Sequence, residues 1–289
     1  AGSSPASGTI CKKIIMLDVS DQIARYLKKK GIEQVFTVTG GGAMFLNKAF
    51  HDVYGRDICY MHHEQACAMA AEGYARITNK PAIVNVTSGP GGINSLNGVF
   101  GAFTDSIPMI IISGQVKNET LVRSYPDKNL RQLGDQEANI EEIVKPICKY
   151  VVGIKKASEL VTELPKALYE ASNGRPGPVW IDIPADVQMQ KIKLIFKNNS
   201  RAKKNNINMQ NKLFKKLDSL LDKSSKPLIL AGTGIRLSST SKDLLKFSKR
   251  LGIPIATAWT HDLIESKSKY FAGRPGTIGT RSGNFCLQN

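Results

Sequence analysis

The sequence predicts an α/β fold in which a largely parallel sheet is flanked by helices. Short apolar runs of strand length alternate with amphipathic stretches of helix length, as in strands joined by helical crossovers. Glycine-rich turns at 40–42 and 88–92 each separate such a run from a helix pattern. The run at 108–113 (PMIIIS) is apolar on both faces, which is typical of a central strand with helices on both sides of its sheet.

The elements of the first unit follow from caps, apolar spacing and turn residues. Asp18 or Ser20 can cap a first helix that buries Ile23 and Leu27 and stops at Gly31. The turn at 40–42 is expected to need glycine, because no β-branched residue would tolerate it. Apolar runs bounded by turn residues predict strands at 34–39, 57–60, 81–87, 108–113 and 178–183. Helical spacing predicts one helix ending near residue 50 and others at 62–76, 93–103 and 160–171.

A second α/β unit is expected after a stretch that has no clear pattern. It begins with a helix at 213–221 and contains two clear strands, at 228–230 and 253–257. An open parallel sheet usually has more strands, so this second domain is expected to be cut short. The predicted organisation is a disordered tail at 1–12, a first α/β domain at 13–190, a basic linker at 191–210 and an incomplete second domain at 211–289.

The composition of the 289 residues is that of an ordinary globular protein, with 42% hydrophobic and 22% charged residues. No apolar run approaches the ~18–20 residues of a membrane helix, and residues 1–10 lack the regions of a signal peptide. The five cysteines are odd in number and include no Cys-x-x-Cys pair, which favours a reducing compartment over a disulfide framework. The sequence therefore predicts a cytoplasmic protein that does not bind membranes.

The net charge of +16 is concentrated in one part of the chain. Residues 191–226 hold eleven Lys or Arg and two Asp, a net of +9. Such a stretch is typical of a solvated linker and an exposed helix face. Aromatic residues do not alternate with its basic ones, as a groove for single-stranded nucleic acid would require. No nucleic-acid partner is expected.

The segment 63–76 (HEQACAMAAEGYAR) places a glutamate, Glu64, at the start of a predicted helix. An acidic residue there is favourable to the helix dipole, which is its simplest interpretation. A zinc site is the alternative, but Cys67 stands where a zinc-protease helix has its second histidine. His63 and Cys67 could chelate from one helix face, yet no third ligand is suggested, so no metal site is assigned.

Three further motifs have simple structural interpretations. The segment 86–94 (VTSGPGGIN) is a strand, glycine turn and helix start that could cradle a phosphate, but it lacks the P-loop and dinucleotide patterns. The segment 174–184 (GRPGPVWIDIP) is a rigid turn into a buried strand. Gly232 and Gly234 form a degenerate Gly-x-Gly after a strand, which does no more than let a helix pack closely.

Taken in order and spacing, these segments resemble the pyrimidine-binding domain of thiamine-diphosphate enzymes, and among them the acetolactate synthase large subunits. The resemblance covers residues 12–289. It is strong in the first domain and continues into the family's central domain through 227–236 and 271–289. The segments that carry it are the turn at 40–42, 63–76, 86–94, Asp105–Pro108, Ser113–Val116, Asp135–Glu137 and 174–184.

The resemblance implies a role for six residues. Glu64 matches the catalytic glutamate that hydrogen-bonds N1′ of the cofactor's aminopyrimidine and favours the tautomer that deprotonates C2 of the thiazolium. Pro90 and Asn94 match positions near the cofactor. Gly41 and Gln115 match positions lining the same region, and Gln136 matches a glutamine on the substrate side.

The activity that the resemblance implies is decarboxylation of a 2-oxo acid followed by ligation to an acceptor, by a transferase or lyase. Three positions depart from the acetolactate synthase pattern. Residue 40 is Gly in place of Pro, Asp135 replaces a bulky aromatic residue, and Ala185 replaces Lys. These departures leave the cofactor chemistry intact, and another 2-oxo acid or an acceptor aldehyde would fit as well.

The family's metal site has no counterpart in this sequence. The resemblance implies that Mg²⁺ holds the diphosphate through a Gly-Asp-Gly and a later Asn on a carboxy-terminal domain, whereas the one Gly-Asp here, at 134–135, precedes Gln136. The chain is therefore expected to be an inactive fragment of a homodimeric or homotetrameric enzyme, with a bound flavin (FAD) left open. The alternative is a non-catalytic module that holds a nucleotide or flavin through Gly232 and Gly234.

Overall fold

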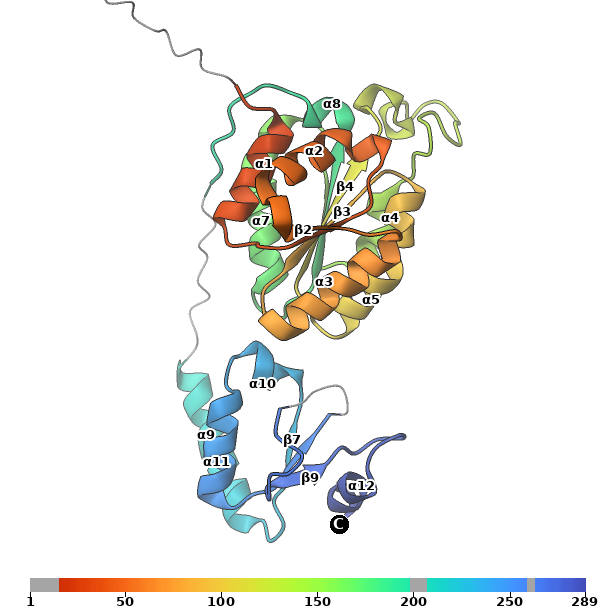
Figure 1. Cartoon of the computed structure of the whole chain (residues 1–289). Coiled ribbons are helices and arrows are strands. Elements are labelled where there is room, and N and C mark those ends of the chain that lie inside the picture. Colours follow the sequence, from red (N-terminus) through yellow and green to blue (C-terminus); the bar gives the residue numbers. More distant parts are fainter. Residues whose placement is uncertain (1–15, 198–206, 259–262) are drawn as a thin grey trace, which may run out of the picture. The chain divides into compact units, whose positions relative to one another are not determined.

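The computed structural model describes residues 16–197, 207–258 and 263–289. The chain divides into two compact units, Ala1–Ser200 and Arg201–Asn289, both visible in Figure 1. The tail expected at 1–12 and residues 198–206 of the expected linker lie outside the described residues. Helix α9, which opens the described part of the second unit, begins at Ile207.

The described residues of the first unit contain a six-stranded sheet with the order β2-β1-β3-β4-β6-β5, and every pair of neighbouring strands is parallel. Its strands are β1 (Val35–Thr37), β2 (Ile58–Tyr60), β3 (Ala82–Val86), β4 (Met109–Gln115), β5 (Tyr150–Gly153) and β6 (Pro178–Pro184). The expected parallel α/β fold is confirmed. Strand β4 lies between β3 and β6 and is buried at every position, as its two-sided apolar sequence predicts.

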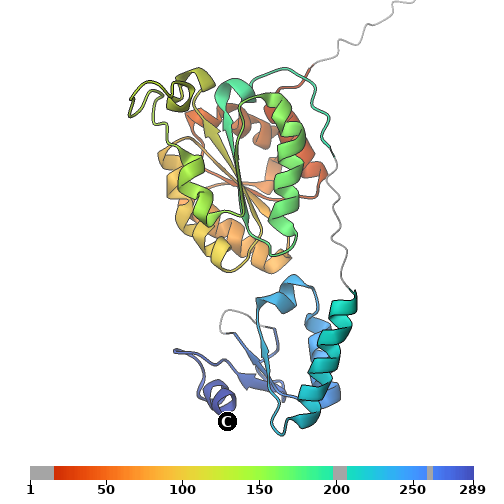
Figure 2. The ribbon, with the colours of Figure 1, turned by 180° about the vertical axis from the view of Figure 1, so that it is seen from behind.

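Helices cover both faces of this sheet (Figures 1 and 2). The α-helices of the unit are α1 (Val19–Lys29), α2 (Met44–Tyr54), α3 (Glu64–Thr78), α4 (Pro90–Asn94), α5 (Leu96–Thr104), α6 (Ile140–Val144), α7 (Leu160–Ser172) and α8 (Ala185–Gln188). One apolar core joins α1, α2 and α7 to one face of the sheet, and a second joins α3, α5 and α6 to the other. The sheet is therefore the middle of three layers.

The first unit departs from the expected elements in several places, and its short helices α6 and α8 were not expected from the sequence. The helix expected at 93–103 is two helices, α4 and α5, with a break at Ser95, whose hydroxyl donates to the Gly92 carbonyl at 2.7 Å. Edge strand β5 was not expected, because its four residues are only half-buried and no turn residues bound it. Asp18 is the N-cap of α1, yet its side chain makes no capping hydrogen bond.

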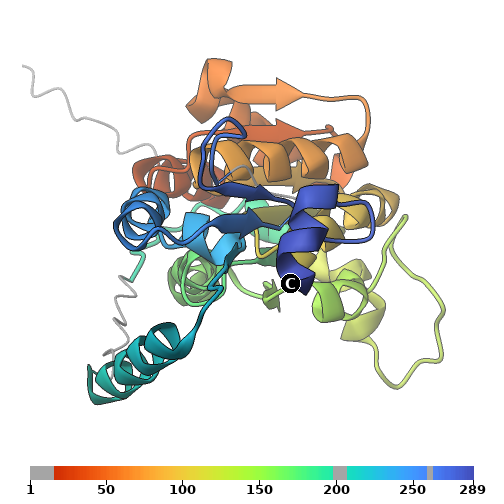
Figure 3. The same cartoon turned by 90° about the horizontal axis from the view of Figure 1, so that it is seen from below.

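The second unit has a smaller parallel sheet of order β7-β8-β9 among its described residues. Its elements are α9 (Ile207–Lys223), β7 (Ile229–Ala231), α10 (Thr233–Leu237), α11 (Ser241–Leu251), β8 (Ile255–Thr257), β9 (Phe271–Gly273) and α12 (Arg281–Gln288). The sequence indicated only two of these strands. Strand β9 has three residues, two of them half-buried, and gives little apolar signal. Residues 211–220 of α9 are exposed, and Figure 3 shows this teal helix apart from the strands of its own unit.

The helices formed by residues 16–197, 207–258 and 263–289 include none long and apolar enough to cross a lipid bilayer.

Candidate functional site

Most of the residues singled out from the sequence meet where strands β1, β3, β4 and β6 end. Parallel strands present their carboxyl ends at one edge of the sheet, where α/β proteins commonly bind ligands. A hollow of about 610 Å³ lies there and is called the glycine-turn hollow below. Its lining residues are Gly40, Gly41, Gly42, Thr87, Ser88, Gln115, Val116, Lys117, Glu119, Thr120, Leu133, Gly134, Asp135, Gln136 and Ala185.

Thr87 joins the two glycine turns at this edge. Its hydroxyl accepts a hydrogen bond from the Gly42 amide at 3.0 Å. A Cβ on Gly40 would lie 2.4 Å from the Thr87 Cβ, and a Cβ on Gly91 would lie 2.7 Å from its Cγ2. Gly40 itself is extended, with φ −169°. The need for glycine expected at this turn therefore arises from close packing against Thr87.

The second turn packs equally closely on Gln136. Gly89 has φ +56°, a conformation that side chains rarely adopt, and a Cβ there would lie 1.9 Å from the Gln136 carbonyl oxygen. Gln136 also has a positive φ, 55°. Its segment therefore rests directly on the turn that precedes α4.

Glu64 begins α3 beside this second turn. The helix is capped by His63, whose side chain accepts from the Gln65 amide. Asn94, at the end of α4, donates to Glu64 Oε2 at 3.1 Å. A Cβ on Gly91 would lie 3.4 Å from Glu64 Oε1, and that oxygen has no hydrogen-bond partner within the part of the chain that the structure describes. The half-buried carboxylate is thus fixed through one oxygen and open at the other.

The zinc alternative finds no support around Glu64. Cys67 is fully buried, and burial together with the nearby Glu64 carboxylate raises the pKa of its thiol to about 12. A thiol held in its neutral form is a poor metal ligand. The His63 side chain is already used as the helix cap. Among residues 16–197, 207–258 and 263–289, no group of three or more His, Cys, Asp or Glu side chains could hold a metal ion.

Gln115 lines the hollow, but its side chain is turned into the protein and is only 2% exposed. Its amide nitrogen donates to Asp182 Oδ2 at 3.2 Å and to the Ala138 carbonyl at 3.3 Å. Its amide oxygen accepts from the Val116 backbone at 3.0 Å. The side chain is therefore committed to internal hydrogen bonds, and only the surrounding backbone faces a ligand.

The structure places the sequence-predicted residues in two adjoining groups. Glu64, Pro90 and Asn94 lie together at the starts of α3 and α4. Gly41, Gln115 and Gln136 line the glycine-turn hollow. The two groups meet through the 88–92 turn, which contacts Thr87, Glu64 and the Gln136 carbonyl.

Three polar residues that organise this site were not predicted from the sequence. Thr87 accepts from the first glycine turn, and Asp182 accepts from the Gln115 amide. Gln188 is fully buried and donates from its amide to the Gly42 carbonyl at 2.7 Å, which holds the first glycine turn. An available signal was the single charge, Asp182, within the apolar strand sequence PVWIDIP.

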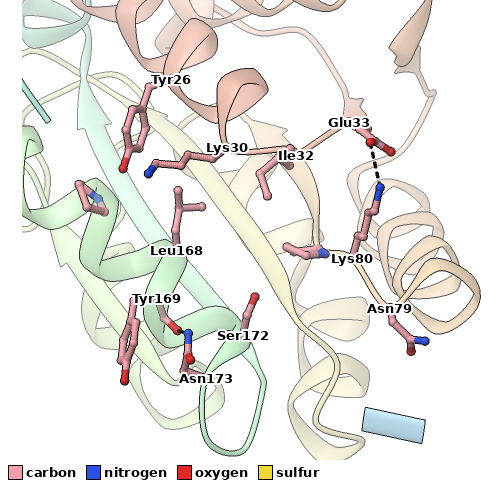
Figure 4. A pocket seen from close by; sticks show the side chains of 13 residues that line it. Tyr26, Lys30, Ile32, Glu33, Asn79, Lys80, Leu168, Tyr169, Ser172 and Asn173 are labelled. Atoms are coloured by element: carbon pink, nitrogen blue, oxygen red, sulfur yellow. Dashed lines mark hydrogen bonds and ion pairs between the residues drawn. The ribbon is translucent and has the colours of Figure 1, made fainter. Parts of the chain in front are cut away.

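A separate cavity of about 500 Å³ lies at the opposite edge of the sheet (Figure 4). Its labelled Glu33 and Lys80 form an ion pair of 2.9 Å across it. The carboxyl ends of helices α1, α3 and α7 border this cavity. Helix carboxyl ends carry partial negative charge and disfavour a phosphate, so the cavity does not resemble a site for a phosphorylated ligand.

The Gly-x-Gly of the second unit does not form a ligand cradle. Nothing lies within 4 Å of a Cβ placed on Gly232 or Gly234. The close helix packing expected there is wrong, and the following helix α10 has only five residues. The geometry gives no support to a nucleotide- or flavin-binding module at these glycines.

Two protein families match successive parts of the chain. Residues 17–138 match the family described as thiamine pyrophosphate enzyme, N-terminal TPP binding domain. Residues 214–289 match the family described as thiamine pyrophosphate enzyme, central domain. The first match includes Glu64, the two glycine turns and Gln136.

Individual relatives carry the name acetolactate synthase. The acetolactate synthase large subunit of Haemophilus influenzae is 33% identical over 276 residues, which cover 94% of this chain and 47% of that protein. The large subunit of Buchnera aphidicola subsp. Acyrthosiphon pisum is 34% identical over 84% of this chain and 42% of its own length. The chloroplastic acetolactate synthase of Arabidopsis thaliana is 29% identical over 90% of this chain and 38% of its own length. The chain thus spans about half the length of the curated relatives it matches.

Proposed function

The chain belongs to the thiamine pyrophosphate enzyme family, and on this premise we propose that it forms the pyrimidine-binding part of an acetolactate synthase-like enzyme. The reaction we propose is decarboxylation of a 2-oxo acid and transfer of the remaining fragment to an acceptor, which makes the enzyme a carboligating transferase with lyase chemistry. The observation that carries the proposal is the Glu64 carboxylate, fixed by Asn94 beside the Gly89–Gly92 turn.

The residues around Glu64 fit the aminopyrimidine of thiamine pyrophosphate (thiamine diphosphate). The carboxylate has one oxygen held by Asn94, and the other has no partner among the described residues. Gly91 presents no side chain beside that oxygen. A carboxylate in this setting can hold a proton at a ring nitrogen. When bound, thiamine diphosphate supplies the electron sink that decarboxylation requires and that no side chain provides.

The other residues position and enclose the reactants in this proposal. Asn94 keeps the carboxylate oriented, and Pro90 fixes the start of α4 beside it. Gly41 and Gln136 border the glycine-turn hollow, which would receive the substrate, while Gln115 holds its wall from behind. Lys117 lines the same hollow, where it pairs with Glu119 at 3.7 Å, and Asp135 adds a second acidic side chain to the lining.

The diphosphate end of the cofactor needs Mg²⁺ ligands that the described residues do not supply as a cluster. We therefore expect the 289-residue chain alone to bind thiamine diphosphate weakly and to be inactive. Isothermal titration of the chain with thiamine diphosphate and Mg²⁺ should give no tight isotherm. A tight isotherm that EDTA abolishes would contradict this expectation. A flavin is not part of the proposal, because Gly232 and Gly234 form no cradle.

A second copy of the chain is the partner we propose for the outer surface of α3, α4 and α5. The large apolar side chains exposed on these helices are Met69, Ile77, Ile93, Phe100 and Phe103. Phe100 and Phe103 lie three residues apart on α5, and α5 packs closely on α3, since a Cβ on Gly98 would lie 2.6 Å from that of Ala68. Exposed large apolar side chains on neighbouring helices are typical of a protein–protein interface.

Phe100→Glu is expected to weaken self-association at least ~10-fold, because it places an unpaired charge in the proposed interface. Analytical ultracentrifugation over a concentration series measures the effect. Ile143→Glu is the matched control, since Ile143 is a comparably exposed apolar residue on α6. Equal effects of the two substitutions, or a chain that stays monomeric throughout, would contradict the proposed interface.

A further inference from the structure

A buried carboxyl group lies behind the wall of the glycine-turn hollow. Asp182, on β6, is 1% exposed. Its Oδ1 accepts from the Ser113 hydroxyl at 2.5 Å and its Oδ2 accepts from the Gln115 amide at 3.2 Å. The indole of Trp180 donates to the same Ser113 hydroxyl at 2.8 Å. The hydrogen bonds to both carboxyl oxygens thus come from the neighbouring strand β4.

Gln115 connects this carboxyl group to the segment 116–138, which leaves β4 and leads to α6. The amide oxygen of Gln115 accepts from Val116, at the start of the segment. Its amide nitrogen donates to the carbonyl of Ala138, at the end of the segment. One side chain therefore clamps both ends of the 116–138 segment, and Asp182 orients that side chain.

The 116–138 segment forms much of the candidate site. It contributes eight of the fifteen residues that line the glycine-turn hollow. Glu137 holds it together internally, since its carboxylate accepts from the backbone amides of Val122 at 2.9 Å and Gly134 at 2.7 Å. The Gln136 carbonyl rests on Gly89. These contacts tie the segment to itself and to the second glycine turn, so the clamp at its ends acts on one connected part of the site wall.

We propose that Asp182 is a positioning residue of the candidate site, whose ionised carboxyl group, acting through Gln115, keeps the 116–138 segment in place. The physical reason is the direction of the hydrogen bonds. An ionised carboxylate only accepts, and both of its partners here donate. A neutral carboxyl group carries a proton of its own. On Oδ2 this proton would face the Gln115 amide, and on Oδ1 it would require the Ser113 hydroxyl, which already accepts from Trp180, to turn its own proton away, so in either case one donor of the network loses its acceptor.

The charged groups that act on Asp182 belong to the same region. Burial raises the pKa of Asp182 to about 7. The hydrogen bonds from Ser113 and Gln115 lower this pKa. The positive charge of Arg123 also lowers it, and the negative charge of Glu141 raises it. Arg123 pairs with Glu141, which also accepts from the Gly153 amide at 3.0 Å. Gly153 is the β5 partner of Asp182. The hydrogen-bond partners of Asp182 on β4, Ser113 and Gln115, are uncharged.

The test uses the 289-residue chain without cofactor and takes Trp180 as the reporter. The sequence has two tryptophans, so Trp259→Phe leaves Trp180 alone. Because burial raises the pKa of Asp182 to about 7, we expect the fluorescence of Trp180 to change as Asp182 ionises. Asp182→Asn, which resembles the neutral carboxyl group, is expected to abolish that transition. We also expect Asp182→Asn to raise hydrogen–deuterium exchange at 116–138 at least ~10-fold at pH 8. Asp105→Asn, at a part-buried aspartate outside the network, is the control and should leave both unchanged.

The pH titration of Trp180 needs no change at Asp182 and remains informative if Asp182→Asn fails to fold. Gln115→Met provides a second route, because it removes the clamp and leaves the carboxyl group; it should increase exchange at 116–138 in the same way. Unchanged exchange at 116–138 in both variants would overturn the proposal. The consequence for catalysis rests on the proposed function, but the positioning of the segment does not. Raised hydrogen–deuterium exchange at 116–138 in both variants of a protein that never binds thiamine diphosphate would refute the proposed function and leave this inference in place.

Discussion

Glu64→Gln is expected to slow proton exchange at C2 of bound thiamine diphosphate by about 10²-fold or more in the assembled enzyme, the usual scale of acid–base assistance. Glutamine keeps the size of the side chain and can still accept from Asn94, but it cannot hold a proton at a ring nitrogen as a carboxylate does. The exchange rate, followed by NMR on the quenched cofactor, measures this step without relying on the identity of the acceptor.

Two control variants separate this chemistry from structural damage. Glu33→Gln changes an exposed glutamate at the opposite edge of the sheet and should leave the exchange rate unchanged. Asn94→Ala keeps the carboxylate and removes its hydrogen bond, so a smaller loss, of about 10-fold, is expected from one charge-assisted hydrogen bond. Exchange at the wild-type rate in Glu64→Gln would remove Glu64 from the mechanism.

The sequence predicted the parallel sheet well because strong apolar periodicity specifies its strands. Strand β4 is the clearest case, since its two-sided apolar run indicated a central position that the strand order confirms. Edge strands β5 and β9 were not recognised, because short half-buried strands are defined by their pairing partners more than by their own residues. The break between α4 and α5 depends on one hydrogen bond from Ser95, which no spacing rule indicates.

The residues of the candidate site could be predicted only where they lie within a short sequence motif. Glu64 and Asn94 were identified from the segments that carry the family resemblance. In the structure, Asn94 Nδ2 lies 3.1 Å from Glu64 Oε2. Gln115 shows the limit of that approach, because its position at the hollow was expected whereas its amide is turned towards Asp182. Contacts of this kind join residues 67 positions apart in the chain and have no local signature.

Gly89→Ala is expected to be far more disruptive than its small size suggests. At φ +56° a side chain costs about 1–3 kcal/mol in backbone strain. The new Cβ would also lie 1.9 Å from the Gln136 carbonyl oxygen, so the 116–138 segment or the turn itself must move. Overpacking of this kind adds about 1–3 kcal/mol. The site should therefore lose both stability and the contact between its two groups of residues.

Gly55→Ala is a closely matched control for this substitution. Gly55 has φ 55° and ψ −112°, whereas Gly89 has φ 56° and ψ −116°, so the backbone strain of an added Cβ is nearly the same at both positions. Nothing lies within 4 Å of a Cβ at Gly55. The difference between the two variants in free energy of unfolding, measured by urea denaturation, thus isolates the clash with Gln136. We expect Gly89→Ala to be less stable than Gly55→Ala by about 1–3 kcal/mol. Gly89→Ala should also increase hydrogen–deuterium exchange at Gln136. Equal free energies of unfolding in the two variants would show that the turn and the 116–138 segment do not depend on one another.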